Sequence, residues 1–327
     1  MRDAPQFWDT ERLQFQNEPP FASGVGLVAA AGVVSPLIML LGPTPVPEET
    51  KFLPGEDLEG QAEWFRSQLQ PLSTLPQEQV RQLRTLVLGD VPEPLVFWVS
   101  TVEALAAGVG DRIRCAVKHQ RGSLGFPTSQ TGSSTVDGFL TAGHVTPGGI
   151  GSTVELETPH RFGSNTYSSL GSVVGHDDPV GLASPGGWDY ALVALAQGVT
   201  APSPLTSSIA SLSAWLPNPV PVTMHAALSG VQTGGIVGAL TTLGVPSPPA
   251  PPATSRLWRD CWIMIPSAIG QQGDSGAAVV ETSTGAAVGM LVGGSRQVPA
   301  ATYAVQYVQD LENLAASVLT PSNISII

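Results

Sequence analysis

From Ile113 onward the chain consists of short apolar runs divided by Gly, Ser, Pro and Asp, and this texture constrains the fold more than any other feature. We expect six strands, a loop rich in Pro and Ser over residues 197–217, and then six more strands. With 36 Gly and 30 Pro, turns are frequent, and no long helical heptads are visible. The pattern predicts an all-β fold of two six-stranded antiparallel β-barrels, at residues 111–200 and 201–327, with a C-terminal helix near residues 308–316.

The first 110 residues have a different character, since they hold 14 acidic and 6 basic residues. Residues 55–70 and 76–88 have the spacing of amphipathic helices. Phe21–Gly42 carries no charge and is long enough to span a bilayer, but it lacks flanking positive charge. Buried strands or a core helix are therefore favoured over a membrane segment. We expect residues 1–110 to form a mixed N-terminal domain that docks on the barrels and regulates them, or binds a regulatory protein partner, while the barrels close without it.

The charge and cysteine content narrow the possible partners and compartment. A formal net charge of −12 argues against nucleic-acid binding, which normally rests on Lys and Arg that neutralise phosphates. The start of the chain has no basic region leading into an apolar core, so it does not resemble a secretory signal. Only Cys115 and Cys261 occur, which favours a reducing, cytoplasmic location, although the two could still pair.

Three short motifs carry candidate chemistry. Thr-Ala-Gly-His ends an apolar strand at His144, Asp-Tyr-Ala-Leu opens another at Asp189, and Gly-Asp-Ser-Gly contains Ser275. They follow one another in the order His, Asp, Ser, at separations of 45 and 86 residues. Each motif alone has an ordinary explanation as a turn or a strand end, but their combination and order favour a catalytic set.

The residue types match the needs of acyl transfer. A serine hydroxyl is too weakly acidic to attack a carbonyl unaided, so it needs an imidazole to accept its proton. The imidazole needs a carboxylate that sets its tautomer and stabilises the imidazolium. The oxyanion that forms needs converging backbone N–H donors, and Gly273 and Ser275 are placed to supply them.

These blocks resemble the trypsin/chymotrypsin-like serine peptidase family over about residues 111–320, and the pattern is nearest to its intracellular bacterial or viral members. The resemblance implies two β-barrels and a serine endopeptidase that works through an acyl-enzyme intermediate. It implies His144 as general base, Asp189 as the group that orients it, and Ser275 as nucleophile. No metal or cofactor is expected, and the partner is a protein or peptide substrate.

The resemblance also extends to Gly289–Gly294, which is similar to the family's strand that lines the specificity pocket and pairs with substrate backbone. It implies substrate contacts at Val292, Gly293 and Gly294, with Ile269 near the base of the pocket. No carboxylate stands there to bind Lys or Arg. We therefore expect a small-to-medium apolar side chain before the scissile bond.

Two departures from the family bear on the site. Val292 stands where many relatives place a serine that hydrogen-bonds the triad aspartate, so Asp189 needs other donors, which we expect to be backbone N–H groups. No activation cleavage site precedes the first barrel, so Asp274 is expected to cap or pair locally.

Two other functions could use similar motifs, and one further cluster could bind a metal. A catalytically silent binding module on the same fold would keep the triad letters without a competent oxyanion hole. A different type of acyl hydrolase would need Gly where Ala277 stands. His176, Asp177 and Asp178 offer three metal ligands, but adjacent residues point in different directions and a turn is favoured.

Overall fold

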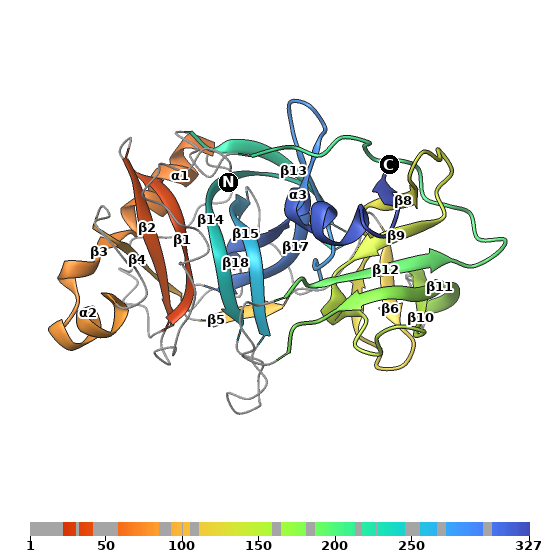
Figure 1. The fold of residues 1–327 in the computed structure, drawn as a ribbon, viewed down its shortest axis with the longest axis horizontal. Helices are drawn as coiled ribbons and strands as arrows, with labels where there is room; N and C mark the ends of the chain where they lie inside the picture. Colours follow the sequence, from red (N-terminus) through yellow and green to blue (C-terminus); the bar gives the residue numbers. More distant parts are fainter. Residues whose placement is uncertain are drawn as a thin grey trace.

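The structure is a computed structural model of the 327-residue chain. It describes residues 22–30, 33–41, 58–84, 93–99, 101–104, 111–158, 165–180, 187–212, 218–226, 228–245, 256–266, 273–296 and 303–327. Within these residues the fold is mainly β, as expected, and two sheets lie side by side (Figure 1).

The first β unit is an eight-stranded sheet in the order β19-β8-β9-β12-β11-β10-β6-β7. Residues 124–126 connect β7, at one end of this order, to β8 near the other end, so the sheet forms a partly closed barrel. Leu140 N–H also donates a hydrogen bond to Phe126 O in this connection. A barrel was expected here, but with six strands and not eight; residues 111–200 contribute seven strands, and β19 from the end of the chain adds the eighth. Its strands are β6 (Arg112–Cys115), β7 (Arg121–Ser123), β8 (Pro127–Gln130), β9 (Gly138–Thr141), β10 (Thr153–Thr158), β11 (Thr166–Asp177), β12 (Tyr190–Leu195) and β19 (Ile324–Ile326).

The second β unit contains six strands whose pairings form a ring. They follow the order β13-β16-β17-β18-β15-β14, and β13 also pairs with β14. This agrees with the second expected barrel. The strands are β13 (Val220–Ala226), β14 (Gly230–Val245), β15 (Arg256–Pro266), β16 (Ala278–Glu281), β17 (Ala287–Arg296) and β18 (Tyr303–Asp310).

The C-terminal helix begins three residues later than expected. β18 continues to Asp310, whose side chain accepts a hydrogen bond from Glu312 N–H at 2.9 Å and so caps α3 (Leu311–Leu314). A single π-helical turn (Ala315–Leu319) follows, and the chain then returns to the first unit, where β19 pairs with β8. The end of the chain therefore ties the second unit to the first.

The front segment contains two helices and five strands among its described residues, and most of it lies at the left of Figure 1. Within the apolar run, residues 22–30 and 33–41 form two strands, in agreement with the buried-strand interpretation. The elements are β1 (Ala22–Ala30), β2 (Val33–Leu41), α1 (Leu58–Ser67), β3 (Gln70–Pro71), a 3₁₀ turn (Leu72–Thr74), α2 (Gln77–Arg84), β4 (Leu95–Val99) and β5 (Thr101–Ala104).

The described strands of the front segment do not form a sheet of their own. β1 pairs antiparallel with β14, β2 pairs with β1 and with β4, and β5 pairs with β17, so the front strands extend the sheet of the second unit. At Gly26 an added Cβ would lie 2.1 Å from Ala239 O, so only glycine allows β1 to approach this closely. β1 joins β14 because strand backbone needs hydrogen-bond partners and the second half of β14 offers an edge.

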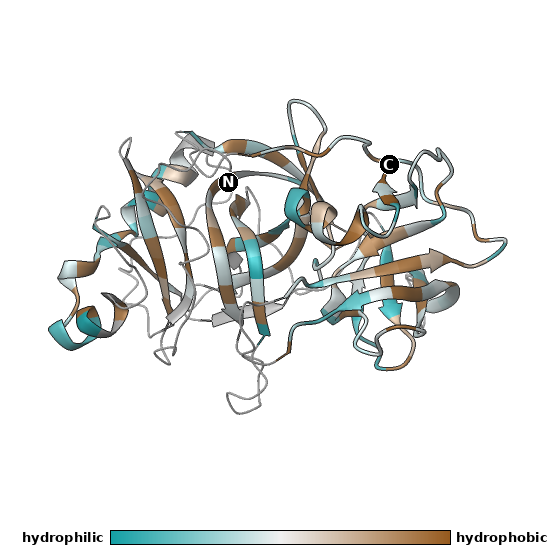
Figure 2. Ribbon diagram, in the orientation of Figure 1, coloured by the Kyte–Doolittle hydropathy of each residue, from teal (hydrophilic) through white to brown (hydrophobic). Residues whose placement is uncertain are grey.

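The cores are shared in the same way. Val25, Leu27 and Ile38 of the front segment belong to one buried cluster with Met224 and Met264 of the second unit. Figure 2 shows the apolar residues concentrated on the strands, whereas α2 is mostly polar. Among the described residues, no helix has both the length and the apolar character needed to cross a membrane.

Candidate active site

His144 lies in a 3₁₀ turn directly after β9 and is almost fully buried. The small residues before it have a steric role, because an added Cβ at Gly143 would lie only 2.0 Å from Asp177 O. Asp189 immediately precedes β12, which pairs with β9 through Ala191 and Thr141. This register brings the two residues together across neighbouring strands.

His144 and Asp189 meet at two points. His144 Nδ1 lies 2.5 Å from Asp189 Oδ2, and His144 N–H donates to Asp189 Oδ1 at 2.8 Å. The carboxylate is fully buried. Because it binds both the ring and the backbone of the same histidine, it fixes the ring's orientation and favours the tautomer with the proton on Nδ1. Nε2 is then the basic nitrogen. The expected backbone donor to Asp189 is confirmed, and it belongs to His144 itself.

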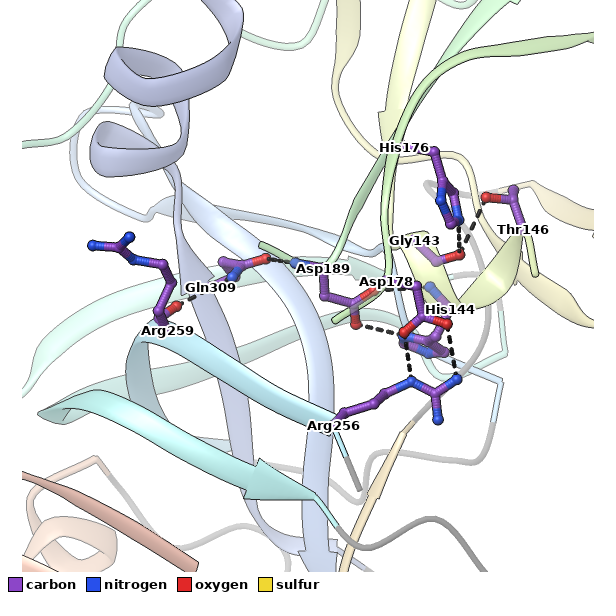
Figure 3. A network of polar contacts seen from close by, with 9 residues as sticks. All are labelled: Gly143, His144, Thr146, His176, Asp178, Asp189, Arg256, Arg259 and Gln309. Atoms are coloured by element: carbon purple, nitrogen blue, oxygen red, sulfur yellow. Dashed lines mark hydrogen bonds and ion pairs between the residues drawn. The ribbon is translucent and has the colours of Figure 1, made fainter. Parts of the chain in front are cut away.

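Gln309, on β18, supports the aspartate from the other side, and the sequence analysis did not identify it. Its Oε1 accepts a hydrogen bond from Asp189 N–H at 2.8 Å, and its Nε2 donates to Arg259 O at 3.1 Å (Figure 3). The side chain is fully buried. Gln309 therefore links the start of β12 in the first unit to β15 in the second.

Two residues of β15 complete the surroundings of the histidine. The Trp258 ring, fully buried, stacks on His144 with centroids 6.1 Å apart. Arg256 forms a bidentate ion pair with Asp178 at 2.6 and 2.9 Å, which Figure 3 also draws. Neither residue was singled out from sequence. The alternation of polar and aromatic residues along β15 gave no sign of what they would face.

Ser275 lies in the turn Gly273–Gly276, which forms hydrogen bonds with both β units. Gly273 and Gly276 have φ of 122° and 93°, values that favour glycine. Ser123 of β7 clamps the turn, because its N–H donates to Ser275 O at 3.1 Å and its hydroxyl to Asp274 O at 3.2 Å. From the second unit, Gly276 N–H donates to Leu291 O at 2.7 Å.

Ser275 makes no side-chain hydrogen bond to His144 or Asp189, but its turn approaches the strand that precedes His144. An added Cβ at Gly276 would lie 2.6 Å from Thr141 Oγ1, which places the turn beside the strand that leads to His144. Ser275 itself is fully buried, and its Oγ has no hydrogen-bond partner among the described residues. The structure thus brings His144 and Asp189 into contact and places the turn that carries Ser275 beside the end of β9.

Asp274 is fully buried and pairs with a serine that is distant in sequence. Its carboxylate accepts hydrogen bonds from the Ser229 hydroxyl and, at 3.3 Å, from Ser229 N–H. Ser229 lies in the turn between β13 and β14. The expected pairing of Asp274 is therefore present, but through the tertiary structure and not locally along the chain.

Three of the four predicted substrate contacts lie on one strand of the second unit. Val292, Gly293 and Gly294 all lie on β17, and the Val292 side chain is fully buried. Gly293 and Gly294 pair with β5. Ile269 lies outside the described residues.

The other candidate sites have structural roles. His176 Nε2 lies 3.0 Å from Gly143 O, Asp177 accepts from Trp188 N–H, and Asp178 binds Arg256. No cluster of three or more potential metal ligands occurs in the described part of the chain.

Both cysteines are free and buried. Burial, together with the nearby carboxylates of Asp260, Asp189 and Asp310, raises the pKa of the Cys261 thiol well above its usual value. A neutral, buried thiol is a poor nucleophile.

Comparisons with known proteins returned no matching family model and no matching curated protein. Solved structures do match. Cellulomonas bogoriensis chymotrypsin is 18% identical, with 67% of this chain and 96% of that one covered and a TM-score of 0.43. Thermobifida fusca protease A is 19% identical, with 68% and 99% covered and a TM-score of 0.42. A glutamic acid-specific serine protease is 18% identical, with 68% and 100% covered and a TM-score of 0.46. These are serine proteases, the class that the sequence motifs resemble, and at such low scores the function has to be argued from the site.

Proposed function

We propose that the chain is a serine endopeptidase in which Ser275 is the nucleophile, His144 the general base and Asp189 the group that orients the base. The two-point contact between His144 and Asp189 carries this proposal. A carboxylate that binds both the backbone and the ring of one histidine leaves Nε2 as the only ring nitrogen able to accept a proton. Such an arrangement serves proton transfer, and the glycine-flanked turn that carries Ser275 lies beside the strand that precedes His144.

In the proposed reaction, the Ser275 hydroxyl attacks the carbonyl carbon of the peptide bond while its proton passes to His144 Nε2. The carbonyl oxygen becomes an oxyanion, which the N–H groups of Gly273 and Ser275 stabilise. The intermediate then collapses, the C–N bond breaks, and His144 returns the proton to the leaving amine. Water, activated by the same imidazole, hydrolyses the acyl-enzyme and releases the second product.

The base and the nucleophile come from different β units, so activity depends on how the units meet. His144 and Asp189 belong to the first unit and Ser275 to the second. The hydrogen bonds of Ser123 and Gln309 cross this boundary and set the distance between them. A shift of the turn or a rotation of the serine side chain would complete the catalytic set, since catalytic hydrogen bonds are often loose before substrate binds.

The proposed substrate is an extended peptide with a small-to-medium apolar side chain before the scissile bond. It would pair with β17 at Gly293 and Gly294, as the resemblance implies, with Ile269 near the pocket base. A cytoplasmic location is part of the proposal, in keeping with two unpaired cysteines in the structure.

A catalytically silent binding module is the alternative, and one observation favours it. Ser275 Oγ is fully buried and makes no hydrogen bond to His144. If this arrangement persists when a peptide is bound, His144 cannot take the serine proton and no acyl-enzyme forms.

A fluorophosphonate probe separates the two functions, because only an activated serine reacts with it. We expect the full chain to be labelled at Ser275 and to hydrolyse peptides, and Ser275→Ala and His144→Ala each to lose hydrolysis. The double variant should lose little more than either single one, because the residues act as a unit. Labelling that survives in Ser275→Ala would refute the nucleophile, and an unlabelled, folded wild-type chain would establish the silent module.

A further inference from the structure

The outer edge of β17 beyond the nucleophile turn is occupied by another part of the same chain. Along one edge, β17 pairs with β18 from Gly289 to Arg296. Along the other edge it pairs with β16 up to Met290 and then with β5 from Gly293 to Arg296. β16 and β5 therefore follow one another on the same edge of one strand.

The nucleophile turn lies between these two partners. Gly276 N–H donates to Leu291 O at 2.7 Å, and Leu291 N–H donates to Ala277 O at 2.9 Å. Ala104, the last residue of β5, is opposite Gly293. Since a strand rises roughly 3.3 Å per residue, the end of β5 lies about 7 Å along β17 from the point that holds the nucleophile turn.

The direction of β5 is that of a substrate. It runs antiparallel to β17, from Thr101 opposite Arg296 to Ala104 opposite Gly293, so its C-terminal end points towards the nucleophile turn. Glu103 is opposite Gly294, one of the two glycines expected to pair with substrate backbone. An external peptide that adds to this edge in the same direction would need the same backbone groups of β17 that β5 uses.

We propose that the edge of β17 at Gly293–Arg296 is a binding site for an extended peptide strand, and that β5 (Thr101–Ala104) is its built-in, competing occupant. The inference rests on the proposed function and adds the regulation of the site. Peptides bind such edges mainly through backbone hydrogen bonds, so β5 and a substrate exclude each other. Because β5 is tethered, its effective concentration is high, and external peptide binds only to the fraction of molecules in which β5 has left.

A competing occupant raises the apparent KM for an external peptide and leaves kcat unchanged. Glu103→Pro removes a backbone N–H and disrupts the strand, so we expect it to lower KM at least about fivefold at constant kcat. Glu103→Ala keeps the backbone and should change KM much less. Gln77→Pro, at the first residue of α2 where proline is tolerated, should keep the wild-type KM.

Two further measurements make the test independent of how well one variant folds. A synthetic peptide of residues 99–104, added to the full wild-type chain, should inhibit hydrolysis competitively, whereas a scrambled peptide should not. The rate of fluorophosphonate labelling, which needs Ser275 but not the β17 edge, should be the same in all folded variants.

The outcomes are distinct. A folded Glu103→Pro variant with unchanged KM, or a peptide of residues 99–104 without effect at millimolar concentration, would overturn the role of β5. A wild-type chain that is not labelled by the probe would instead overturn the proposed function itself. Mass spectrometry of the intact protein should accompany each measurement, to confirm that every preparation contains the full, uncleaved chain.

Discussion

Two buried glutamines of β18, three residues apart, have opposite surroundings. Gln309 binds Asp189 N–H and Arg259 O, and so supports the group that orients His144. Gln306 is equally buried, but within the described part of the chain neither polar atom of its side chain has a hydrogen-bond partner. An unpaired buried polar group destabilises the folded state, whereas a paired one keeps its partners satisfied.

Substituting the two glutamines should therefore have opposite effects. Gln309→Leu removes the acceptor of the buried Asp189 N–H, at about 1–3 kcal/mol, and one of the donors to Arg259 O, so we expect a lower Tm. It should also lower kcat more than it raises KM, because it loosens Asp189 and hence His144. Gln306→Leu removes two unpaired polar atoms and should raise Tm. Thermal unfolding and steady-state kinetics measure both effects, and equal Tm shifts in the two variants would contradict the role of Gln309.

At the scale of an element, the turn that carries Ser275 is held from both sides. Ser123 of the first unit binds the carbonyls of Asp274 and Ser275, and Ser229 of the second binds the Asp274 carboxylate. Two residues of the turn are glycines with positive φ, and glycine adopts many backbone conformations. The conformation of the turn therefore depends more on these contacts than on the backbone preferences of its own residues.

We expect Ser229→Ala to lower kcat with little change in KM, because the buried Asp274 carboxylate loses a donor and the N–H groups of Gly273 and Ser275 shift. Ser229→Thr keeps the hydroxyl and should restore most of the activity. Ser229→Ala should also lower Tm, because it loses one charge-assisted hydrogen bond. Such a bond contributes about 1.5–3 kcal/mol to the free energy of unfolding. Wild-type kinetics in Ser229→Ala would show that the contact does not hold the turn.

The junction of β18 and α3 depends on an unusual carboxyl group. The pKa of Asp310 is raised to about 7, mainly by burial and further by the nearby Asp260 carboxylate. The hydrogen bond from Glu312 N–H lowers the pKa but does not offset these two effects. In the unfolded chain the group titrates near its ordinary value of 3.8. Between these two values the folded chain retains a proton that the unfolded chain has lost, so this contribution to stability falls as pH rises from about 4 to about 7.

Asp310→Asn cannot ionise and can still cap α3. We expect its stability relative to wild type to increase between pH 4 and pH 8, with most of the change complete above pH 7. Denaturant unfolding at a series of pH values measures this difference. A difference that is constant with pH would mean that the Asp310 carboxyl titrates alike in both states.

At the scale of the whole molecule, the front segment and the second unit share one sheet and one core. β1 covers the outer edge of β14, and Val25, Leu27, Ile38 and Leu40 are buried together with residues of the second unit. Burying one aliphatic side chain of this size contributes about 1.5–3 kcal/mol. The expectation that the barrels stand without residues 1–110 therefore needs a direct test, and the docking and regulatory role of that segment remains a prediction.

A chain that begins at Gly110 should have a lower Tm and aggregate more readily than the full chain, because it exposes apolar side chains and the edge of β14. A chain that begins at Pro20 keeps every described strand and is the matched control. If the two truncated chains unfold at the same temperature, the front segment is an accessory to the barrels and not part of their structure.

The sequence by itself determined the local features of this protein. Strand texture is a property of a few consecutive residues, so the six strands of the second unit, most strands of the first and the terminal helix could be predicted, but not that β19 joins the first unit. Residue types around His144, Asp189 and Ser275 are constrained by chemistry and by tight backbone approach, as at Gly143, so the candidate triad could also be predicted. Even the contact between His144 and Asp189 follows from two motifs at the ends of neighbouring strands.

Only the tertiary structure decided which distant segments meet. Any apolar strand can pair with any free edge, so nothing in the sequence of β1 or β5 names β14 or β17 as the partner. The same holds for Gln309, Trp258 and Ser229, ordinary residues until the fold places them against Asp189, His144 and Asp274. A strand can pair with any sheet edge whose backbone groups lack partners. Which edges lack partners depends on how the rest of the chain folds.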